Sequence, residues 1–435
     1  MFIVMNRRPV PVVAFAMILA LFRAGTAGAA ETVAVRCGQV IDVRSGQLSA
    51  GSTILVRDGH IAEVGPGVAP PADATVVDLT HATCLPGLID SHVHLLFEPG
   101  DVEPGYLNRS SAHKALDGLR AAQLLLRLGF TTLRNPGDMD AFYATVEIRN
   151  AIQRGEFVGP RLLVAPHFLS PTGGHGDLNE LSPDIASLAR GKIVNGADAM
   201  RAAVREEIKY GADWIKLFAT GGVLSAATDP NAQGFTDEEL RAAAEEAHRH
   251  GKKVCAHAIG TAGITASLKA GIDSIEHGFL IDDEGIALMK QRGAFLVPTI
   301  EIADYVVEEG AQHGLTPDRV AKARALLSNR DRRLRAAFAA GVKIAFGTDS
   351  GPMPHGRGVR EFAKMAALGL TPLQVVRAAT AGGAELLGLE KEIGTIEPGK
   401  RADIVACAEN PLTNIRALEQ VKFVMKDGRV IRNDF

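Results

Sequence analysis

The sequence has few cysteines and no strong charge of one sign. It has four cysteines in 435 residues, and no two form a CxxC pair: Cys37, Cys84, Cys255 and Cys407. A chain of this size does not need cross-links to hold its core, so we predict no disulfide framework. Cys255 lies in an apolar segment and is predicted to be a buried free thiol. The formal net charge is −3 without a basic stripe, which gives no support for nucleic-acid binding.

The apolar run near the start, residues 9–22, is shorter than the roughly 20 residues that span a bilayer. Two arginines precede it and small residues follow, ending in Ala27-Gly28-Ala29. This layout is typical of a secretory signal peptide. We predict that residues 1–30 are a signal peptide and that cleavage leaves an exported protein, periplasmic or secreted, without membrane contact. An uncleaved membrane anchor is the alternative.

Two similar hairpin patterns occur far apart in the chain. LVRDGHIAEVG (55–65) and VMKDGRVIRND (424–434) each place Asp-Gly between apolar segments, which is a signal for a tight β-hairpin. They predict one small β unit built from both terminal regions.

Between these hairpins, short apolar runs alternate with amphipathic helical stretches. One such stretch, 236–251, begins with a capping box of Thr236 and Glu239 and ends at Gly251. Eight runs read as strands: 85–95, 130–136, 161–166, 213–219, 253–259, 273–278, 294–300 and 342–350. Alternating strands and helices predict a parallel sheet, and eight strands close a (β/α)₈ TIM barrel. Its chemistry would sit at the C-terminal ends of the strands.

Polar residues lie at those strand ends. His92 and His94 end the first strand, and two residues apart on a strand they face the same way. His257, His277 and Asp349 end three later strands. Imidazole nitrogens and carboxylate oxygens are ligands for Zn²⁺, with Mn²⁺ and Co²⁺ as alternatives. The pattern therefore predicts a metal site at the barrel mouth.

The chain resembles the amidohydrolase superfamily. The resemblance is carried by PGLIDSHVHL, His257, His277, GTDS and IGTIEPGKRADIVACAENPL (393–412). It implies an α/β chain with a barrel that holds one or two metals and a small β-sandwich formed by both termini. The expected boundaries are 1–30 for the signal peptide, 31–86 plus 390–435 for the sandwich, and 87–389 for the metallohydrolase barrel.

Lys216 stands in the apolar run DWIKLFATGG (213–222), although lysine is seldom buried without a partner. The resemblance implies a carboxylated lysine at this position. Desolvation favours the neutral amine, which can react with CO₂ to give an anionic carbamate. By resemblance, His92, His94 and Asp349 bind the first metal, His257 and His277 bind the second, and Lys216 bridges them. A lysine paired with a carboxylate is the alternative.

Other stretches, including HAIGTAGI, resemble the metal-dependent dipeptidase and carboxypeptidase branch, with its prolidase-like and ochratoxin-hydrolysing amidases. The resemblance implies a homo-oligomer that hydrolyses small amides or dipeptides and releases a C-terminal amino acid. Asp349 would move the proton to the leaving nitrogen. His167 and His175 are further catalytic or substrate-binding candidates, with solvated loop histidines as the alternative. Arg134 could bind a substrate carboxylate or form an internal ion pair.

Rival functions share the same ligands. A cyclic amide hydrolase, imidazolonepropionase-like or hydantoinase-like, is one alternative, and a lactonase or organophosphate hydrolase is another. A non-enzymatic binding protein on this scaffold would have lost metal ligands, and none of the six is lost.

Overall fold

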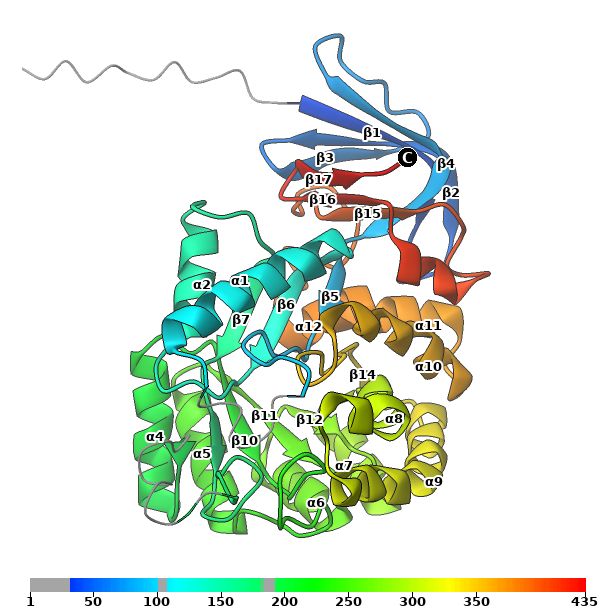
Figure 1. Cartoon of the computed structure of the whole chain (residues 1–435). Coiled ribbons are helices and arrows are strands. Elements are labelled where there is room, and N and C mark those ends of the chain that lie inside the picture. Colours follow the sequence, from blue (N-terminus) through cyan, green and yellow to red (C-terminus); the bar gives the residue numbers. More distant parts are fainter. Residues whose placement is uncertain (1–31, 101–107, 181, 183–191) are drawn as a thin grey trace, which may run out of the picture.

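The computed structural model describes residues 32–100, 108–180, 182 and 192–435. The predicted signal peptide lies outside the described residues. Among the helices in these ranges, none combines the length and the apolar character that a bilayer crossing requires. Figure 1 shows a β-sheet that joins both terminal regions above a larger body in which helices surround parallel strands.

Strands from both terminal regions form one seven-stranded sheet in the order β17-β16-β15-β4-β1-β2-β3. Its strands are β1 (Thr32–Ile41), β2 (Leu48–Arg57), β3 (His60–Gly65), β4 (Thr75–Pro86), β15 (Ile404–Cys407), β16 (Phe423–Lys426) and β17 (Arg429–Asn433). β4 is central, because it pairs with β1 on one side and with β15 on the other.

Both predicted hairpins are confirmed. Asp58 and Gly59 connect β2 to β3 with φ of 50° and 75°, and Asp427 and Gly428 connect β16 to β17 with φ of 46° and 77°. Positive φ at both central residues is the geometry of the type I′ turn, which Asp-Gly adopts readily.

The terminal sheet curls on itself instead of forming two facing layers. An isolated bridge between His60 and Arg401 brings its β3 end beside the segment that leads into β15. Ile54, Ile404 and Phe423 then share one buried core. The structure thus has one seven-stranded sheet here, and the predicted small β-sandwich is not confirmed.

The prediction that the cysteines form no disulfide is wrong. Cys37 on β1 and Cys84 on β4 are joined by a disulfide. Their sequence separation of 47 residues concealed this, because the parallel pairing of β1 and β4 brings them together. Cys255 and Cys407 are buried free thiols, as predicted for Cys255.

All eight predicted strands of the central body are present. Their bounds are β5 (Leu88–Asp90), β6 (Phe130–Pro136), β7 (Arg161–Ala165), β10 (Trp214–Phe218), β11 (Lys253–Ala258), β12 (Ser274–His277), β13 (Phe295–Val297) and β14 (Lys343–Ile344), with two additional short strands, β8 (Phe168–Ser170) and β9 (Lys192–Ile193). Every pair among them is parallel.

The parallel strands form two sheets, β5-β6-β7 and β14-β13-β12-β11-β10-β8-β9, and not one continuous closed ladder. Isolated contacts join their edges. Ser91 N donates to Phe346 O at 2.8 Å, and Asp213 N donates to Val164 O at 2.8 Å. The predicted closed barrel thus appears as two sheets linked by backbone hydrogen bonds.

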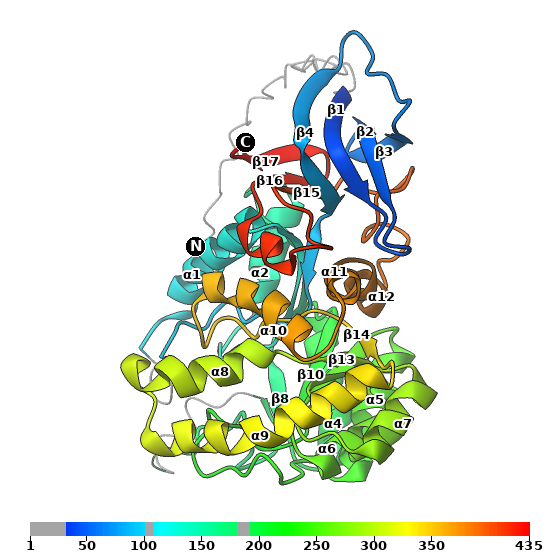
Figure 2. The ribbon, with the colours of Figure 1, turned by 90° about the vertical axis from the view of Figure 1, so that its right-hand side faces the viewer.

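Helices cover the outside of these sheets. They are α1 (Ser111–Arg127), α2 (Ala144–Gln153), α4 (Ala197–Lys209), α5 (Asp237–Arg249), α6 (Thr261–Ala270), α7 (Asp283–Arg292), α8 (Ile300–Glu309), α9 (Pro317–Ala339), α10 (Glu361–Ala367), α11 (Pro372–Arg377) and α12 (Gly383–Leu387). The predicted capping box of Thr236 and Glu239 begins α5. Figure 2 shows α8 and α9 at the end of the body away from the terminal sheet.

Candidate metal centre

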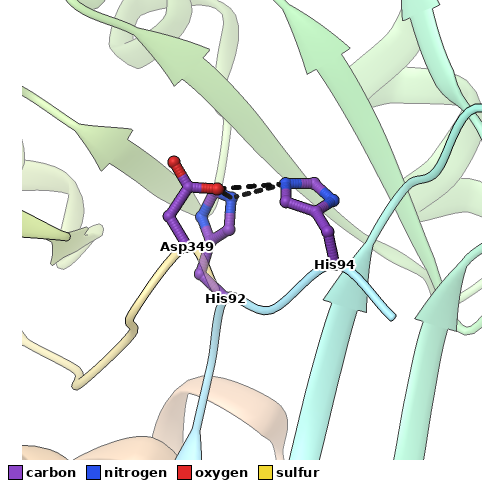
Figure 3. A group of neighbouring side chains, drawn as sticks. All are labelled: His92, His94 and Asp349. Carbon is purple, nitrogen blue, oxygen red and sulfur yellow. Dashed lines mark hydrogen bonds and ion pairs between the residues drawn. The ribbon is translucent and has the colours of Figure 1, made fainter. Parts of the chain in front are cut away.

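His92, His94 and Asp349 converge at the C-terminal side of the strands, and we name them the first half-site. Each contributes one donor atom, and these atoms lie within 4.8 Å of one another. Asp349 Oδ1 is 3.5 Å from His92 Nε2 and 3.2 Å from His94 Nε2. Figure 3 shows the Asp349 carboxylate turned toward both rings. Two imidazoles and a carboxylate form a donor set that suits a divalent transition metal.

Asp90 explains how residues so far apart in sequence meet. Its buried carboxyl group accepts from the backbone N–H of His92 at 3.0 Å and from that of Thr348 at 3.1 Å. It also accepts from the Thr348 hydroxyl at 2.7 Å. Burial raises the pKa of Asp90 to about 7. Asp90 therefore ties the end of β5 to the segment that carries Asp349.

The protein fixes the ring orientation of both first half-site histidines. His94 Nδ1 lies 2.5 Å from Gly137 O, and since a carbonyl can only accept, Nδ1 carries the proton. His92 Nδ1 lies 2.6 Å from Glu276 Oε2. Both rings therefore present Nε2 as the nitrogen that can bind a metal. Such partners behind metal-binding histidines set the tautomer.

Lys216, His257 and His277 line the same cavity as the first half-site, and we name them the second half-site. Lys216 lies in β10, His257 in β11, and His277 ends β12. The His257 and His277 ring centroids are 4.6 Å apart, and those of His92 and His277 are 5.3 Å apart. The six predicted ligands thus gather in one cavity.

The three side chains of the second half-site are held by contacts of different kinds. His257 Nε2 lies 3.0 Å from Gly221 O and must donate to it, which leaves Nδ1 as the nitrogen for a metal. His277 Nδ1 lies 2.7 Å from the Thr299 hydroxyl. Lys216 is 1% exposed, and within the part of the chain that the structure describes its Nζ makes no hydrogen bond or ion pair, only a cation–π contact 5.6 Å from the Phe218 ring centroid.

Burial keeps most of these groups in the neutral form that binds metals. Desolvation, together with Lys216, holds the pKa of His92 well below 6.5. Burial and neighbouring histidines do the same for His257, and burial with His92 for His277. Burial also lowers the pKa of Lys216 from 10.5. For His94 burial is the largest single cause and lowers the pKa, but the hydrogen bond to Asp349 and the charges of Asp349 and Asp138 together outweigh it, so the net change is upward.

Arg134 does not lie where it could hold a substrate carboxylate. It is fully buried and does not line the cavity. Its guanidinium donates to both Glu276 oxygens at 2.8 Å, to Ser274 Oγ at 3.1 Å and to Ser91 O at 2.5 Å. The alternative of an internal ion pair is therefore correct. Arg134 pairs with the Glu276 carboxylate, and Glu276 in turn orients His92.

His167 also points away from the cavity, so the prediction that it touches substrate is contradicted. Its Nδ1 lies 3.0 and 3.1 Å from the two carboxylate oxygens of Glu207 on α4, and its ring packs edge-on against Tyr143. The side chain is buried between the strand end and the surrounding helices. Its part is structural.

His175 does line the cavity. Its Nδ1 lies 2.7 Å from Ser225 Oγ, and its ring lies against those of Phe218 and His257. Gly222 makes room for it, because a Cβ there would be 2.3 Å from the ring. Burial lowers the pKa of His175 to about 3, so the ring is neutral.

The remaining cavity wall is largely apolar. It includes Phe97, Phe168, Phe218, Phe279, Ile302 and Val306. Ile302 and Val306 belong to α8, so the segment after β13 supplies one side of the cavity. The six predicted ligands thus share one cavity with a largely apolar wall, which suits a ligand with apolar groups around a polar centre.

Two supporting residues were missed by the sequence analysis. Glu276 was detectable as an acid inside the buried strand DSIEHG, next to a predicted ligand. The contact of Thr299 could not be predicted from the sequence, because a threonine directly before a helix is expected to be an ordinary N-cap.

Residues 83–431 match the amidohydrolase family. The chain belongs to the amidohydrolase family. Ochratoxinase from Aspergillus niger is 34% identical over 369 residues, 80% of this chain and 75% of that protein, and its crystal structure superposes with a TM-score of 0.82 over 93% of this chain and 96% of that one at 29% identity.

A crystal structure of a Xaa-Pro dipeptidase with bound methionine in the active site superposes on this amidohydrolase with a TM-score of 0.87 and 35% identity, over 93% of this chain and 100% of that chain. Imidazolonepropionase from Cutibacterium acnes is 28% identical over 85% of this chain and 88% of that protein. The family and these relatives make the protein a hydrolase that acts on amide bonds.

Proposed function

We propose that this amidohydrolase uses two divalent metal ions, Zn²⁺ in the first instance, to release a C-terminal amino acid from dipeptides or N-acyl amino acids. The observation that carries the proposal is the gathering of six suitable side chains in one cavity. His92, His94 and Asp349 would hold one ion through Nε2, Nε2 and a carboxylate oxygen. His257 and His277 would hold the other.

Lys216 would bridge the two ions as a carbamate. A buried ammonium without an anionic partner is costly, and the lowered pKa of Lys216 favours the neutral amine. The amine nitrogen would form a bond to the carbon of CO₂, one C=O bond would open to a carboxylate oxygen, and one proton would leave to solvent. The product carries one negative charge shared by two oxygens, and each oxygen could serve one cation.

The bound ions would supply Lewis-acid polarisation of the amide carbonyl and activation of a water molecule. Asp349 would accept a proton from that water at its carboxylate and deliver it to the leaving nitrogen. It is suited to this, because its side chain is 14% exposed whereas those of His92 and His94 are 1% and 9% exposed. His175, neutral and fixed by Ser225, would contact the substrate beside this centre.

The substrate class is supported by the apolar wall and by the names of two relatives, ochratoxinase and Xaa-Pro dipeptidase. We expect N-acyl amino acids and dipeptides with apolar side chains to be hydrolysed. The test is a panel of such compounds, offered to purified zinc-loaded protein and followed by release of free amino acid. An inactive result across the panel, with two metals bound, would overturn the proposal.

A cyclic amide hydrolase is the second candidate, because imidazolonepropionase is among the relatives. The same panel should therefore include small cyclic amides and imides. Turnover of these compounds with no turnover of dipeptides would select this alternative.

We also propose that the protein is exported. The proposal rests on the N-terminal sequence and is supported by the Cys37–Cys84 disulfide, since disulfides persist in oxidising compartments. Fractionation of cells, with N-terminal sequencing of the product, tests it.

A further inference from the structure

Three adjacent strand ends of the cavity share an unusual backbone conformation. His277 is the last residue of β12, and Thr299 and Asp349 follow β13 and β14; their φ angles are 71°, 41° and 57°. Positive φ is uncommon for residues other than glycine, and for a β-branched residue such as threonine it is a genuine outlier. Strain of this kind persists where the surroundings impose it, often at functional sites.

Two of these residues are proposed metal ligands, and Thr299 is not. What distinguishes Thr299 is its hydroxyl group, which lies 2.7 Å from His277 Nδ1. Thr299 is fully buried, so the contact is shielded from water. The strained backbone therefore aims a hydroxyl at Nδ1 of a proposed ligand, and this Nδ1 also lies 4.0 Å from Asp349 Oδ2.

Thr299 also occupies the N-cap position of α8, where a threonine hydroxyl normally accepts a hydrogen bond from the first turn. It makes no such bond. Instead, the side-chain oxygens of Glu361 on α10 accept from the N–H groups of Ile300 and Glu301 at 2.8 and 2.7 Å. Glu361 thus caps α8 from outside, and the Thr299 hydroxyl is left for His277.

We propose that Thr299 is a positioning residue that holds the His277 ring with Nδ1 protonated and Nε2 directed at the metal. The Thr299 oxygen accepts the Nδ1–H, just as Gly137 O does for His94. This inference rests on the two-metal site proposed above.

The first test measures metal affinity. Thr299→Val keeps the β-branched shape and loses the hydroxyl, whereas Thr299→Ser keeps the hydroxyl. We expect the affinity for the second Zn²⁺, measured by competition with a chelator, to fall about 10–100-fold in Thr299→Val and to stay near the wild-type value in Thr299→Ser. Thr261→Val is the matched control, since the Thr261 hydroxyl bonds Leu280 O and touches no ring. Equal affinities in Thr299→Val and wild type would overturn the proposal.

The second test reads the ring directly in metal-free protein. Nitrogen-15 NMR of the histidine rings, with His277→Asn used to identify the His277 signals, should show protonated Nδ1 in the wild type and in Thr299→Ser. Thr299→Val should shift the ring toward the other tautomer. The same tautomer in all three proteins would overturn the positioning role. If the wild type binds only one metal, the two-metal function fails while this measurement still decides the role of Thr299.

Discussion

The two half-sites of the cavity are prepared for metal binding to different degrees. In the first, Asp349 already contacts both His92 and His94, and the Nδ1 atom of each ring faces a hydrogen-bond acceptor. In the second, only His257 is fixed in that way, and Lys216 makes no hydrogen bond or ion pair in the described ranges 32–100, 108–180, 182 and 192–435. The protein alone organises the first half-site, whereas the second, under the proposed function, would depend on carboxylation of Lys216 and on the metals.

We expect the largest effect from removing Lys216, the residue proposed to bridge the two metals. Lys216→Ala should abolish amide hydrolysis, because the second half-site loses its only anionic ligand, while the first half-site keeps its three ligands. Elemental analysis should show the metal content falling from two equivalents to one. Added short carboxylic acids with metal should restore part of the activity by supplying the lost oxygens. A variant with full activity and two metals would contradict the carbamate.

The support behind the first half-site can be removed separately. In Glu276→Gln, Arg134 becomes a buried cation without its anion, and the free energy of unfolding should fall by about 3–5 kcal/mol. His92 also loses its carboxylate partner, so affinity for the first metal should fall about 10–100-fold. Denaturant unfolding of metal-free protein and chelator competition measure the two effects.

The double variant Glu276→Gln/Arg134→Met separates these two effects of Glu276. It should recover much of the stability, because no unpaired charge remains buried, but it should not recover the metal affinity. Recovery of both would show that Glu276 acts on the metal only through the stability of the fold.

Carbon dioxide should distinguish the half-sites in the intact protein. Metal-free protein given Zn²⁺ in CO₂-depleted buffer should fill the first half-site at its usual rate and the second more slowly. Bicarbonate should accelerate the second uptake several-fold and leave the first unchanged. Stopped-flow mixing with a zinc indicator resolves the two steps, and an equal response of both steps would contradict the difference between the half-sites.

The disulfide should have the smallest effect on either half-site. Replacing Cys37 and Cys84 with serine removes a cross-link between residues that are 47 positions apart. Because the unfolded chain regains its loop-closure entropy, the free energy of unfolding should fall by about 4 kcal/mol. Since both residues lie in the terminal sheet, metal content and the turnover rate should stay unchanged at 25 °C while the melting temperature falls. A change in metal affinity would show that the sheet helps to position the ligands.

The sequence was sufficient to predict the eight parallel strands, the Asp-Gly hairpins and the gathering of the six proposed ligands, because these depend on local periodicity and on the rule that strand ends meet. It was insufficient for side-chain direction just beyond a strand. His167 lies between β7 and β8 and His175 lies in the loop after β8, yet one faces Glu207 and the other faces the cavity.

Long-range pairing was equally hidden from the sequence. Arg134 and Glu276 are 142 residues apart. The sequence alone is consistent with each residue binding either a ligand or another side chain, and only their contact decides between the two. The Cys37–Cys84 link and the Thr299 hydroxyl contact depend likewise on strand register and on a strained backbone, neither of which leaves a pattern in composition or spacing.

The central place of β4 in the terminal sheet has a consequence for biosynthesis. Its partner β15 is translated more than 300 residues later, which takes roughly 15–60 s at about 5–20 residues per second. Throughout that interval one edge of β4 carries unpaired backbone groups, which favour intermolecular strand pairing. A nascent chain stalled before β15 would therefore be prone to aggregation, and a chaperone that covers the β4 edge would raise the yield of folded enzyme.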